Sequence, residues 1–356
     1  MRFSRARRLF LTLLSAAGLL FPAAAAQAAT AFVGAGALDK SPDTVNFVAD
    51  PGESNSVTVK EVFNPFRVEI HDAAVAITPG AGCSSVDANT VRCVDDAEVF
   101  EFELGDGDDF LSLQDTTVVR GWYLGGDGDD TIVAGDDIDS TDRLRGGAGN
   151  DTLRGRAGRD FLNGGPGADV LRGGNSIACE TAGICPQEPD SVTYAGRTND
   201  VFVDQDGEAD DGELGEGDMV ADDIEAIIGG KGNDRLRGGR PHTFFLEDVP
   251  HRFGTSLYGG PGNDVLRGTR AFDVLWGAQG NDVLRGGGRG DLLSGRTGDD
   301  KLVGGPGRDQ LHGGDGGDTL IARDGRRDHL FGANGPDRAQ IDVALDTVRD
   351  VERLIP

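Results

Sequence analysis

The sequence of 356 residues has few aromatic side chains, little basic charge and few cysteines, and each shortage excludes a class of protein. Phenylalanine, tyrosine and tryptophan make up 6% of the residues, too few to fill the core of a conventional large domain. Lys and Arg number 34 against 61 Asp and Glu, so the basic excess typical of nucleic-acid binding is missing. Such a composition excludes nucleic acid as a partner and favours cations.

Long apolar runs are also scarce, and the one such stretch, residues 9–21, lies near the start of the chain. Four arginines precede it and the small-residue site Ala26-Gln27-Ala28 follows it, which is the order of a secretory signal peptide. The run is shorter than the roughly 20 residues that a membrane span needs. We therefore expect residues 1–28 to be a signal peptide, the mature chain to be extracellular, and no segment to span a membrane.

The four cysteines do not form a metal or redox motif. Cys83 and Cys93 are ten residues apart and Cys179 and Cys185 are six apart, so neither pair is a CxxC. In an oxidising compartment the simplest assignment is two local disulfides, Cys83–Cys93 and Cys179–Cys185. Four cysteines allow three pairings, and a free thiol stays possible.

What the sequence does have is glycine, 57 residues of it, arranged in a repeat of nine residues. From Gly259 the chain divides into units such as GGPGNDVLR, GAQGNDVLR and GGDGGDTLI, and an earlier array from Gly125 contains GGDGDDTIV and GGAGNDTLR. Related units begin at Leu104 and Gly229. The repeats define two arrays, residues 104–175 and 229–340.

Each unit has a loop half and a strand half. Glycines at positions one, two and four permit a tight loop, which an aspartate at position six closes. The last three residues form a short strand whose middle side chain is apolar. A single such side chain per unit is a thin core, so only stacked units can bury it, and the fold is a solenoid. The predicted buried residues are Ile132, Leu144, Leu153, Leu162, Leu171, Leu236, Leu266, Leu275, Leu284, Leu293, Leu302, Leu311 and Leu320.

These units resemble the G-G-x-G-x-D-x-U-x nonapeptides of the RTX, or haemolysin-type calcium-binding, family. The resemblance implies a parallel β-roll in which two nonapeptides make one turn and Ca²⁺ lies between loops stacked on the same side. The chemistry agrees, because Ca²⁺ prefers carboxylate and backbone carbonyl oxygens. The position-six aspartates implied as ligands are Asp109, Asp130, Asp151, Asp169, Asp234, Asp264, Asp282, Asp300, Asp318 and Asp337.

If alternate units share a side, the loops fall into two columns. The glycine-complete column, which contains the aspartates just named, keeps glycine at position four in the arrays. The arginine-bearing column contains Asp142, Asp160, Asp273, Asp291, Asp309 and Asp328, which are possible weaker calcium ligands. There Ala271 and Arg289 replace glycine, and Arg159, Arg308 and Arg326 lie near the expected sites. We expect these guanidinium groups to pair with the aspartates in place of the ion, although both columns loading with calcium is the alternative.

The other segments are expected to complete an all-β protein. Residues 29–103 predict a small antiparallel β unit that caps the roll, residues 176–228 an inserted β segment, and residues 341–356 a C-terminal cap. The acidic stretch 204–213 lacks the order of EF-hand ligands, so a solvated loop is favoured over an extra cation site. The insertion 242–253 is expected to pack on the roll.

The sequence contains no HExxH zinc-protease motif and no GxSxG nucleophile elbow. We therefore expect a secreted calcium-binding β-roll that folds on extracellular calcium and acts as a structural or surface-associated module without its own catalysis. One alternative is a hydrolase with an unrecognised site in the N-terminal or inserted segment, since spatially assembled catalytic groups leave little trace in sequence. Another is an adhesin that presents the insertion 242–253. The protein or surface partner is not identified by sequence.

Overall fold

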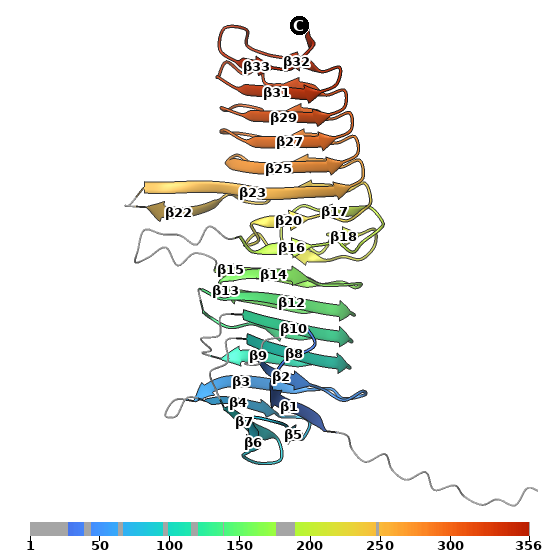
Figure 1. The fold of residues 1–356 in the computed structure, drawn as a ribbon, viewed down its shortest axis with the longest axis vertical. Coiled ribbons are helices and arrows are strands. Elements are labelled where there is room, and N and C mark those ends of the chain that lie inside the picture. The colour runs from blue at the N-terminus through green and yellow to red at the C-terminus, as the bar shows by residue number, and fades with distance from the viewer. Residues whose placement is uncertain are drawn as a thin grey trace, which may run out of the picture.

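The computed structural model describes residues 28–38, 44–62, 67–94, 99–114, 120–137, 139–175, 189–246 and 249–355, without the side chains of residues 94, 175 and 242–252. The described chain winds into a long parallel β-roll of flattened turns (Figure 1). The predicted signal peptide lies outside the described residues except for Ala28. The described residues include no helix long and apolar enough to cross a membrane.

One sheet, sheet A, runs the whole length of the roll. Its strands in the roll pair in parallel, and each is followed along the chain by a loop and a short strand on the opposite side. The strands are β8 (Val99–Asp106), β10 (Arg120–Asp127), β12 (Thr141–Ala148), β14 (Arg159–Asn163), β16 (Ser191–Thr193), β20 (Ala226–Ile228), β23 (Val249–Pro261), β25 (Phe272–Gln279), β27 (Leu292–Thr297), β29 (Gln310–Asp315), β31 (His329–Asn334) and β33 (Thr347–Arg349).

The opposite side of the roll is divided between two sheets. Sheet B backs the first array with β9 (Phe110–Gln114), β11 (Thr131–Val133), β13 (Thr152–Ala157), β15 (Val170–Asn175) and β19 (Met219–Val220). Sheet C backs the second array with β17 (Val201–Val203), β18 (Gly212–Glu213), β21 (Arg235–Arg237), β24 (Val265–Arg267), β26 (Val283–Arg285), β28 (Lys301–Val303), β30 (Thr319–Ile321), β32 (Arg338–Gln340) and β34 (Arg353–Leu354).

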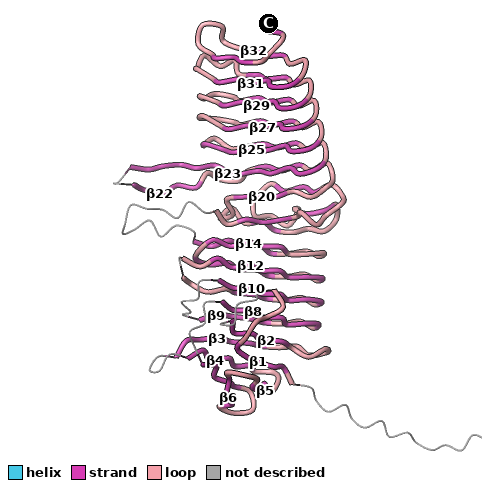
Figure 2. Tube along the Cα trace, viewed as in Figure 1, coloured by secondary structure: helices cyan, strands magenta, loops and turns pink. Residues whose placement is uncertain are grey.

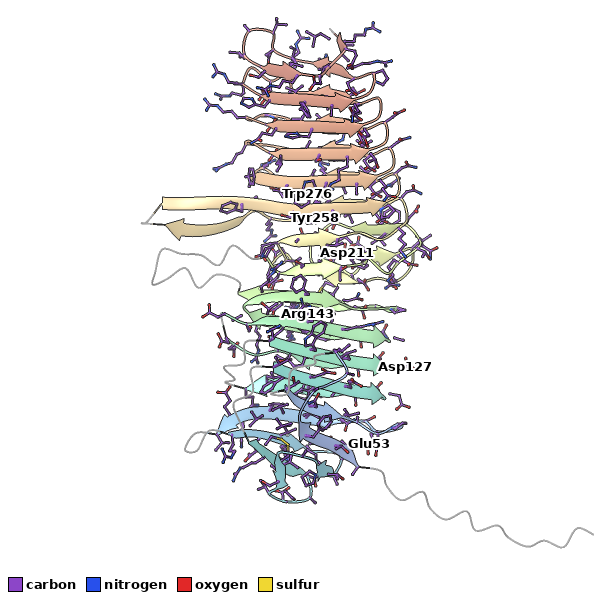
Figure 3. All side chains as sticks on the ribbon, viewed as in Figure 1. Glu53, Asp127, Arg143, Asp211, Tyr258 and Trp276 are labelled. Atoms are coloured by element: carbon purple, nitrogen blue, oxygen red, sulfur yellow. A yellow bond between two sulfur atoms is a disulfide. The ribbon has the colours of Figure 1, made fainter. Side chains whose placement is uncertain are left out.

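The core is the predicted ladder of apolar side chains. From Ile132 to Leu320, every residue predicted to be buried is at most 1% exposed. The register places them opposite one another, as in the run Leu144, Leu162, Val192 along sheet A. Residues on either side of this row face outward, and Arg143, Tyr258 and Trp276 lie on the outer face of sheet A (Figure 3). One inward side chain per short strand is therefore enough to form a core, because the strands of the neighbouring rungs cover it on either side.

The N-terminal strands cap the roll with antiparallel pairs, as predicted. Two of them pair in parallel with the first rung, β2 with β8 and β3 with β9. The others extend the sheets in antiparallel pairs such as β1–β2 and β3–β4, except β5, which pairs with β1 in parallel. The strands are β1 (Ala29–Val33), β2 (Thr44–Val48), β3 (Ser56–Val62), β4 (Arg67–Asp72), β5 (Ile77–Pro79), β6 (Cys83–Ser85) and β7 (Thr90–Val94). The disulfide Cys83–Cys93 joins β6 to β7. Cys179 and Cys185 lie outside the described residues.

The inserted segment does not interrupt the roll. Strands β16 and β20 continue sheet A, while β17 starts sheet C next to the end of sheet B. The later insertion differs from expectation, because β22 (His242–Leu246) and the first part of β23 form an antiparallel hairpin that projects from the flank of the roll instead of packing on it (Figure 1). The expectation failed because β22 finds all its backbone partners in β23.

Candidate calcium sites along two loop columns

The loops of the repeats form two columns on opposite flanks of the roll (Figure 2). Segments that lead from sheet A to sheet B or C make up the glycine-complete column, for example residues 125–130, from the end of β10 to the start of β11, and residues 277–282, from the end of β25 to the start of β26. Loops that lead back to sheet A make up the arginine-bearing column, for example residues 286–291 between β26 and β27. The nine-residue period therefore assigned these loops to the correct columns.

The position-six aspartates of the glycine-complete column form a hydrogen-bonded ladder. Each is at most 3% exposed, and its Oδ1 accepts the backbone N–H of the corresponding aspartate in the preceding rung. The first member of each array differs, because Asp109 accepts from Asn55 and Asp234 accepts from Val201. Donor–acceptor distances between the N and Oδ1 atoms of successive aspartates are 2.8–2.9 Å, from Asp109 to Asp169 in the first array and from Asp234 to Asp337 in the second. The ladder fixes one oxygen of each carboxylate. It leaves the other free to bind an ion except in Asp234, whose Oδ2 accepts the N–H of Gly230 at 2.6 Å.

The second oxygen, Oδ2, is buried and accepts no hydrogen bond in most of these aspartates, including Asp130, Asp151 and Asp282. It lies beside the position-one glycine of its own unit. A Cβ built on Gly125 would collide with Asp130 Oδ2 and would lie 2.6 Å from the carbonyl oxygen of Gly146 in the next rung. Two oxygens therefore border the same space, and only glycine leaves that space open. This donor set of carboxylate and carbonyl oxygens fits Ca²⁺.

The arginine-bearing column repeats this arrangement, which corrects one prediction. Oδ2 of Asp160, Asp291, Asp309 and Asp328 is buried and accepts no hydrogen bond, so no guanidinium group occupies the place of the ion there. Arg289, Arg308 and Arg326 are exposed. The prediction failed because the aspartate Oδ1 atoms are held inward by the N–H groups of the preceding rung, as in Asp273 to Asp291 at 2.9 Å, while these three arginine side chains lie on the surface.

The remaining aspartates predicted for this column lie at corresponding places. Asp142 and Asp273 are 2% and 1% exposed, and Asp142 N–H donates to Asp160 Oδ1 at 3.3 Å. Asp273 accepts N–H bonds from Thr255 and Thr269 at 2.7 Å each, so both of its oxygens are already engaged. Asp273 is thus the member of the arginine-bearing column least free to bind an ion.

Burial makes these carboxyl groups hard to ionise in the absence of a cation. Desolvation raises the pKa of Asp130 to about 7 and that of Asp169 to about 8, with neighbouring aspartates adding to the rise. In the arginine-bearing column desolvation raises the pKa of Asp160 to about 9 and that of Asp291 to about 8. Stacked like charges in a dry environment disfavour ionisation, and a divalent cation between them would reverse that preference.

A second ladder, which the sequence analysis missed, distinguishes the two columns. At position five of the glycine-complete column, Asp or Asn Oδ1 accepts the N–H of the next rung, as in Asn150 to Asp129 at 2.7 Å and Asn281 to Asn263 at 2.7 Å. The acceptors are Asp108, Asp129, Asn150, Asp200, Asn233, Asn263, Asn281 and Asp299. The arginine-bearing column has Arg159, Phe272, Gly290, Arg308 and Arg327 at position five, whose side chains cannot accept such a bond. The alternation of Asp or Asn with these residues was visible in the sequence.

The structure also adds aspartates that no nonapeptide marks. Asp169 N–H donates to Asp218 Oδ1 at 2.9 Å, and Asp160 N–H donates to Asp190 Oδ1 at 2.8 Å. Asp218 and Asp190 are almost fully buried. Asp218 continues the aspartate ladder of the glycine-complete column, and Asp190 that of the arginine-bearing column, into the segment where sheet B ends. At the C-terminal end, Asp346 and Glu352 are the last acceptors, so the tail closes both ladders. Their sequence neighbours lack the repeat pattern, which is why they were not predicted.

At the join between the two arrays a guanidinium group does occupy the glycine-complete column. Arg197, 16% exposed at its side chain, donates to the carbonyl oxygen of Gly165 and to Glu216 Oε1 at 2.7 Å. Its own loop stacks on the next one through Lys231 N–H to Arg197 O at 2.9 Å. Arg197 thus lies in the column through contacts with a carbonyl oxygen and Glu216, which differ from the predicted pairing of guanidinium groups with position-six aspartates.

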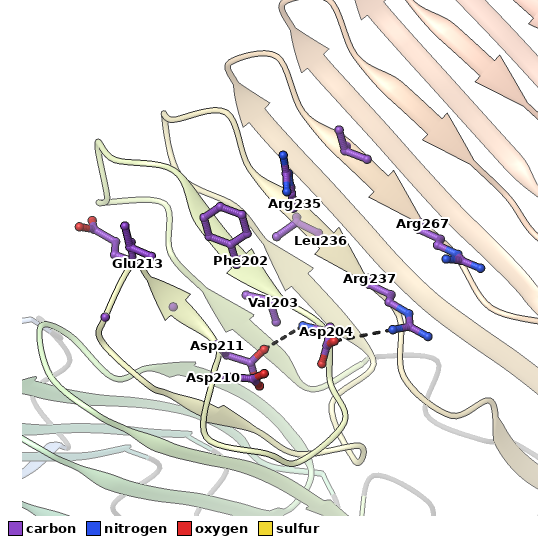
Figure 4. A pocket seen from close by; sticks show the side chains of 14 residues that line it. Phe202, Val203, Asp204, Asp210, Asp211, Glu213, Arg235, Leu236, Arg237 and Arg267 are labelled. Carbon is purple, nitrogen blue, oxygen red and sulfur yellow. Dashed lines mark hydrogen bonds and ion pairs between the residues drawn. The ribbon is translucent and has the colours of Figure 1, made fainter.

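The acidic stretch 204–213 folds into a loop beside sheet C. It brings one carboxylate oxygen of each of Asp204, Asp210 and Asp211 within 4.8 Å of one another (Figure 4). Both oxygens of Asp211 already accept N–H bonds, from Asp204 at 2.8 Å and Val220 at 2.9 Å, and Asp204 faces Arg237 at 3.7 Å. Asp211 thus serves to hold the loop in place.

Comparison with protein families matches the same segments. The family described as RTX calcium-binding nonapeptide repeat (4 copies) matches residues 124–141, 139–171, 221–240, 258–288 and 285–320. The comparison with curated proteins found no match. The matched residues contain most of the glycine loops, ladder aspartates and leucines described above, while Asp109, Asp328 and Asp337 lie outside them. The matched segments are therefore RTX calcium-binding nonapeptide repeats, and they wind into an all-β parallel β-roll whose repeats bind Ca²⁺.

Proposed function

We propose that the protein is exported and completes its folding when its loops bind extracellular calcium. The observation that carries the proposal is the row of buried aspartate Oδ2 atoms without hydrogen-bond partners. An unpaired buried carboxylate is costly, and the raised pKa values of these groups express that cost. Binding of Ca²⁺ would remove the cost in the folded roll alone, so binding and folding are coupled.

The calcium ligands in this proposal come from both columns. In each, the aspartate Oδ2 of one unit and the carbonyl oxygens of position-one glycines supply oxygen donors. Bound Ca²⁺ would supply positive charge between stacked carboxylates and so keep them ionised. We propose that the glycine-complete column binds more tightly, since its second ladder holds the loops in register.

The test is a calcium titration of the mature, calcium-free protein followed by far-UV circular dichroism, with magnesium as control. We expect a gain of β signal specific to calcium, because Mg²⁺ demands a smaller and more regular octahedral site. A protein that is fully folded without calcium, with a spectrum unchanged by calcium, would refute coupled folding.

We propose further that the chain acts as a structural or surface-associated module without catalysis of its own. The support is the sequence, which spends most of its residues on repeats and contains neither HExxH nor GxSxG. Hydrolysis of ester, peptide or glycoside substrates by the purified calcium-loaded protein would refute this part.

The projecting hairpin favours a second candidate, presentation of residues 242–253 to a partner (Figure 1). Its two strands leave the flank of the roll, where they are accessible. Deletion of 242–253 would abolish partner binding and keep calcium binding if this candidate is correct, whereas a deletion variant that still binds the partner would exclude it.

A further inference from the structure

The outer face of sheet C has an unusual distribution of charge. Strands β21, β24, β26, β28, β30, β32 and β34 contain seven basic residues and no acidic residue, in a chain with a net charge of −27. The basic residues are Arg235, Arg237, Arg267, Arg285, Lys301, Arg338 and Arg353, and all are exposed. By contrast, strands β25–β33 of sheet A carry the exposed acid Asp315 as well as the exposed Arg296 and Arg349. The face of sheet C is therefore a local region of positive charge on an acidic molecule.

Three of the arginines are stacked in register. Arg237 is paired with Arg267, and Arg267 with Arg285, on consecutive parallel strands. Neighbouring strands are about 4.8 Å apart, so these side chains start close enough to repel one another. Within the described residues, Arg237 alone of the seven has an ion-pair partner, Asp204 at 3.7 Å. A row of like charges without acids between them is unfavourable unless an external anion neutralises it.

The arginine row borders two shallow hollows. One, of about 470 Å³, lies between the acidic loop and Arg235, Arg237 and Arg267 (Figure 4). The other, of about 350 Å³, is lined by Arg267 and Arg285 together with Val303 and three glycines. Both hollows are open to solvent. Arg267 lines both of them, so they lie next to each other along the roll. This shape suits an extended ligand that lies along the roll axis.

We infer that this face binds a linear acidic polysaccharide, with its carboxylate or sulfate groups on Arg237, Arg267 and Arg285. Guanidinium groups match such groups with paired hydrogen bonds. A polymer that carries anionic groups at regular intervals can place more than one of them on the row of arginines. The small side chains beside the row, Val265 on β24 and Val303 opposite Arg285 on β28, leave the sheet surface accessible to a flat sugar chain.

Other anionic partners fit the face less well. Proteins that bind single-stranded nucleic acid stack bases on aromatic side chains, and the seven sheet C strands that form this face contain none. The one aromatic side chain that lines the first hollow, Phe202 of β17, already has the Arg235 guanidinium over its ring, 5.4 Å from the ring centroid. A protein partner needs an apolar centre to its interface, whereas the centre of this face is a row of arginines. The polysaccharide is therefore the occupant that charge and surface chemistry favour.

This inference goes beyond calcium-coupled folding and requires only that the roll be folded. The experiment uses the mature protein in calcium, with far-UV circular dichroism to show that each variant is folded. Binding is measured by isothermal titration calorimetry to hyaluronan, which bears carboxylates, to heparin, which bears sulfates as well, and to uncharged dextran. Failure of calcium-coupled folding appears in the dichroism, and failure of this inference appears in the calorimetry.

The decisive variant is the triple replacement Arg237→Ala, Arg267→Ala, Arg285→Ala. Its matched control replaces three exposed loop arginines, Arg323, Arg326 and Arg327, and changes the net charge by the same amount. We expect salt-sensitive binding to hyaluronan, heparin or both, none to dextran, and a loss of about tenfold in the sheet C variant, the sum of three exposed ion pairs. The control should change affinity by less than about threefold.

Two results would overturn the inference. The first is a folded protein that binds neither acidic polymer, or that binds them equally well after the triple replacement. The second is binding of duplex DNA as tight as that of heparin and equally dependent on the three arginines, which would assign the face to polyanions in general. Binding to hyaluronan distinguishes a carboxylate ligand from a sulfate ligand.

Discussion

The two loop columns of the roll have the same buried carboxylates but different surroundings. In the glycine-complete column, a second ladder of Asp and Asn at position five locks each loop to the next, as at Asn263 and Asn281. In the arginine-bearing column, position five holds arginine, phenylalanine or glycine, so this second ladder is missing there. The comparison teaches that the same buried carboxylates can be held in loops with and without a second ladder.

Among the changes that test this comparison, removal of calcium should have the largest effect on the stability of the roll. A chelator would leave the unpartnered Oδ2 atoms of both columns without a cation, so we expect the thermal midpoint to fall by at least about 20 °C. Differential scanning calorimetry at stepwise free calcium would measure it. Two binding steps would show that the columns differ in affinity, and a single step would show that they do not.

The pH dependence of the calcium-free protein should be the next largest effect. The folded pKa values of about 6 to 8, for example those of Asp282 and Asp291, lie above the unfolded value near 4, so the folded state binds more protons between these limits. The free energy of unfolding of the calcium-free roll should therefore fall as pH rises from about 4 to 8.

Urea unfolding at several pH values would measure this. Saturating calcium is the control, because protons then compete with the ion and stability should instead rise with pH. A calcium-free protein that becomes more stable from pH 5 to 8 would contradict the burial argument.

A matched pair of substitutions separates the columns. Asp282→Ala and Asp291→Ala remove buried aspartates, each 1% exposed, that accept an N–H at 2.8 and 2.9 Å. Each should cost about 1–3 kcal/mol without calcium, because a buried N–H loses its acceptor. With calcium, D282A should lose more than D291A if the glycine-complete column binds more tightly. Equal losses in calcium, measured by urea unfolding, would indicate equivalent columns.

Arg197→Ala tests the arginine at the join of the arrays. The substitution removes the contacts with the Gly165 carbonyl and Glu216, and leaves Glu216 buried without its cation. We expect a loss of about 1–3 kcal/mol in urea unfolding that does not depend on calcium. Arg145→Ala, an exposed arginine of sheet A, is the control. A loss that disappears in calcium would mean that an ion can replace the guanidinium group.

Arg289→Gly should have the smallest effect. Glycine removes the strain of the positive φ, which stabilises the folded state, but it also raises the entropy of the unfolded chain, which opposes folding. We therefore expect the free energy of unfolding to rise by up to about 1 kcal/mol. The number of bound calcium ions should not change, because Asp291 Oδ2 already has no partner. An increase in bound calcium, measured by equilibrium dialysis, would revive the idea that Arg289 closes the site.

Much of the fold and of the candidate calcium sites could be predicted from the sequence, because the repeat is a local pattern with a fixed period. The row from Ile132 to Leu320 and the two columns follow from a nine-residue unit and a turn of two units. Arg289 and Arg308 were placed in the correct column, but their contacts with aspartates were wrongly predicted. Sequence position shows that two groups are near each other and does not show which way each side chain points.

The sequence by itself determined the period, the buried leucine row, the calcium-binding repeat and the surplus of acid. Tertiary structure alone decided that Asp190 and Asp218 extend the ladders across 30 and 49 residues, that sheet B gives way to sheet C beneath a continuous sheet A, and that Arg197 occupies a loop column. It also assembled Arg237, Arg267 and Arg285 into one row. These features depend on which rung stacks on which, and that register is set by long-range backbone pairing.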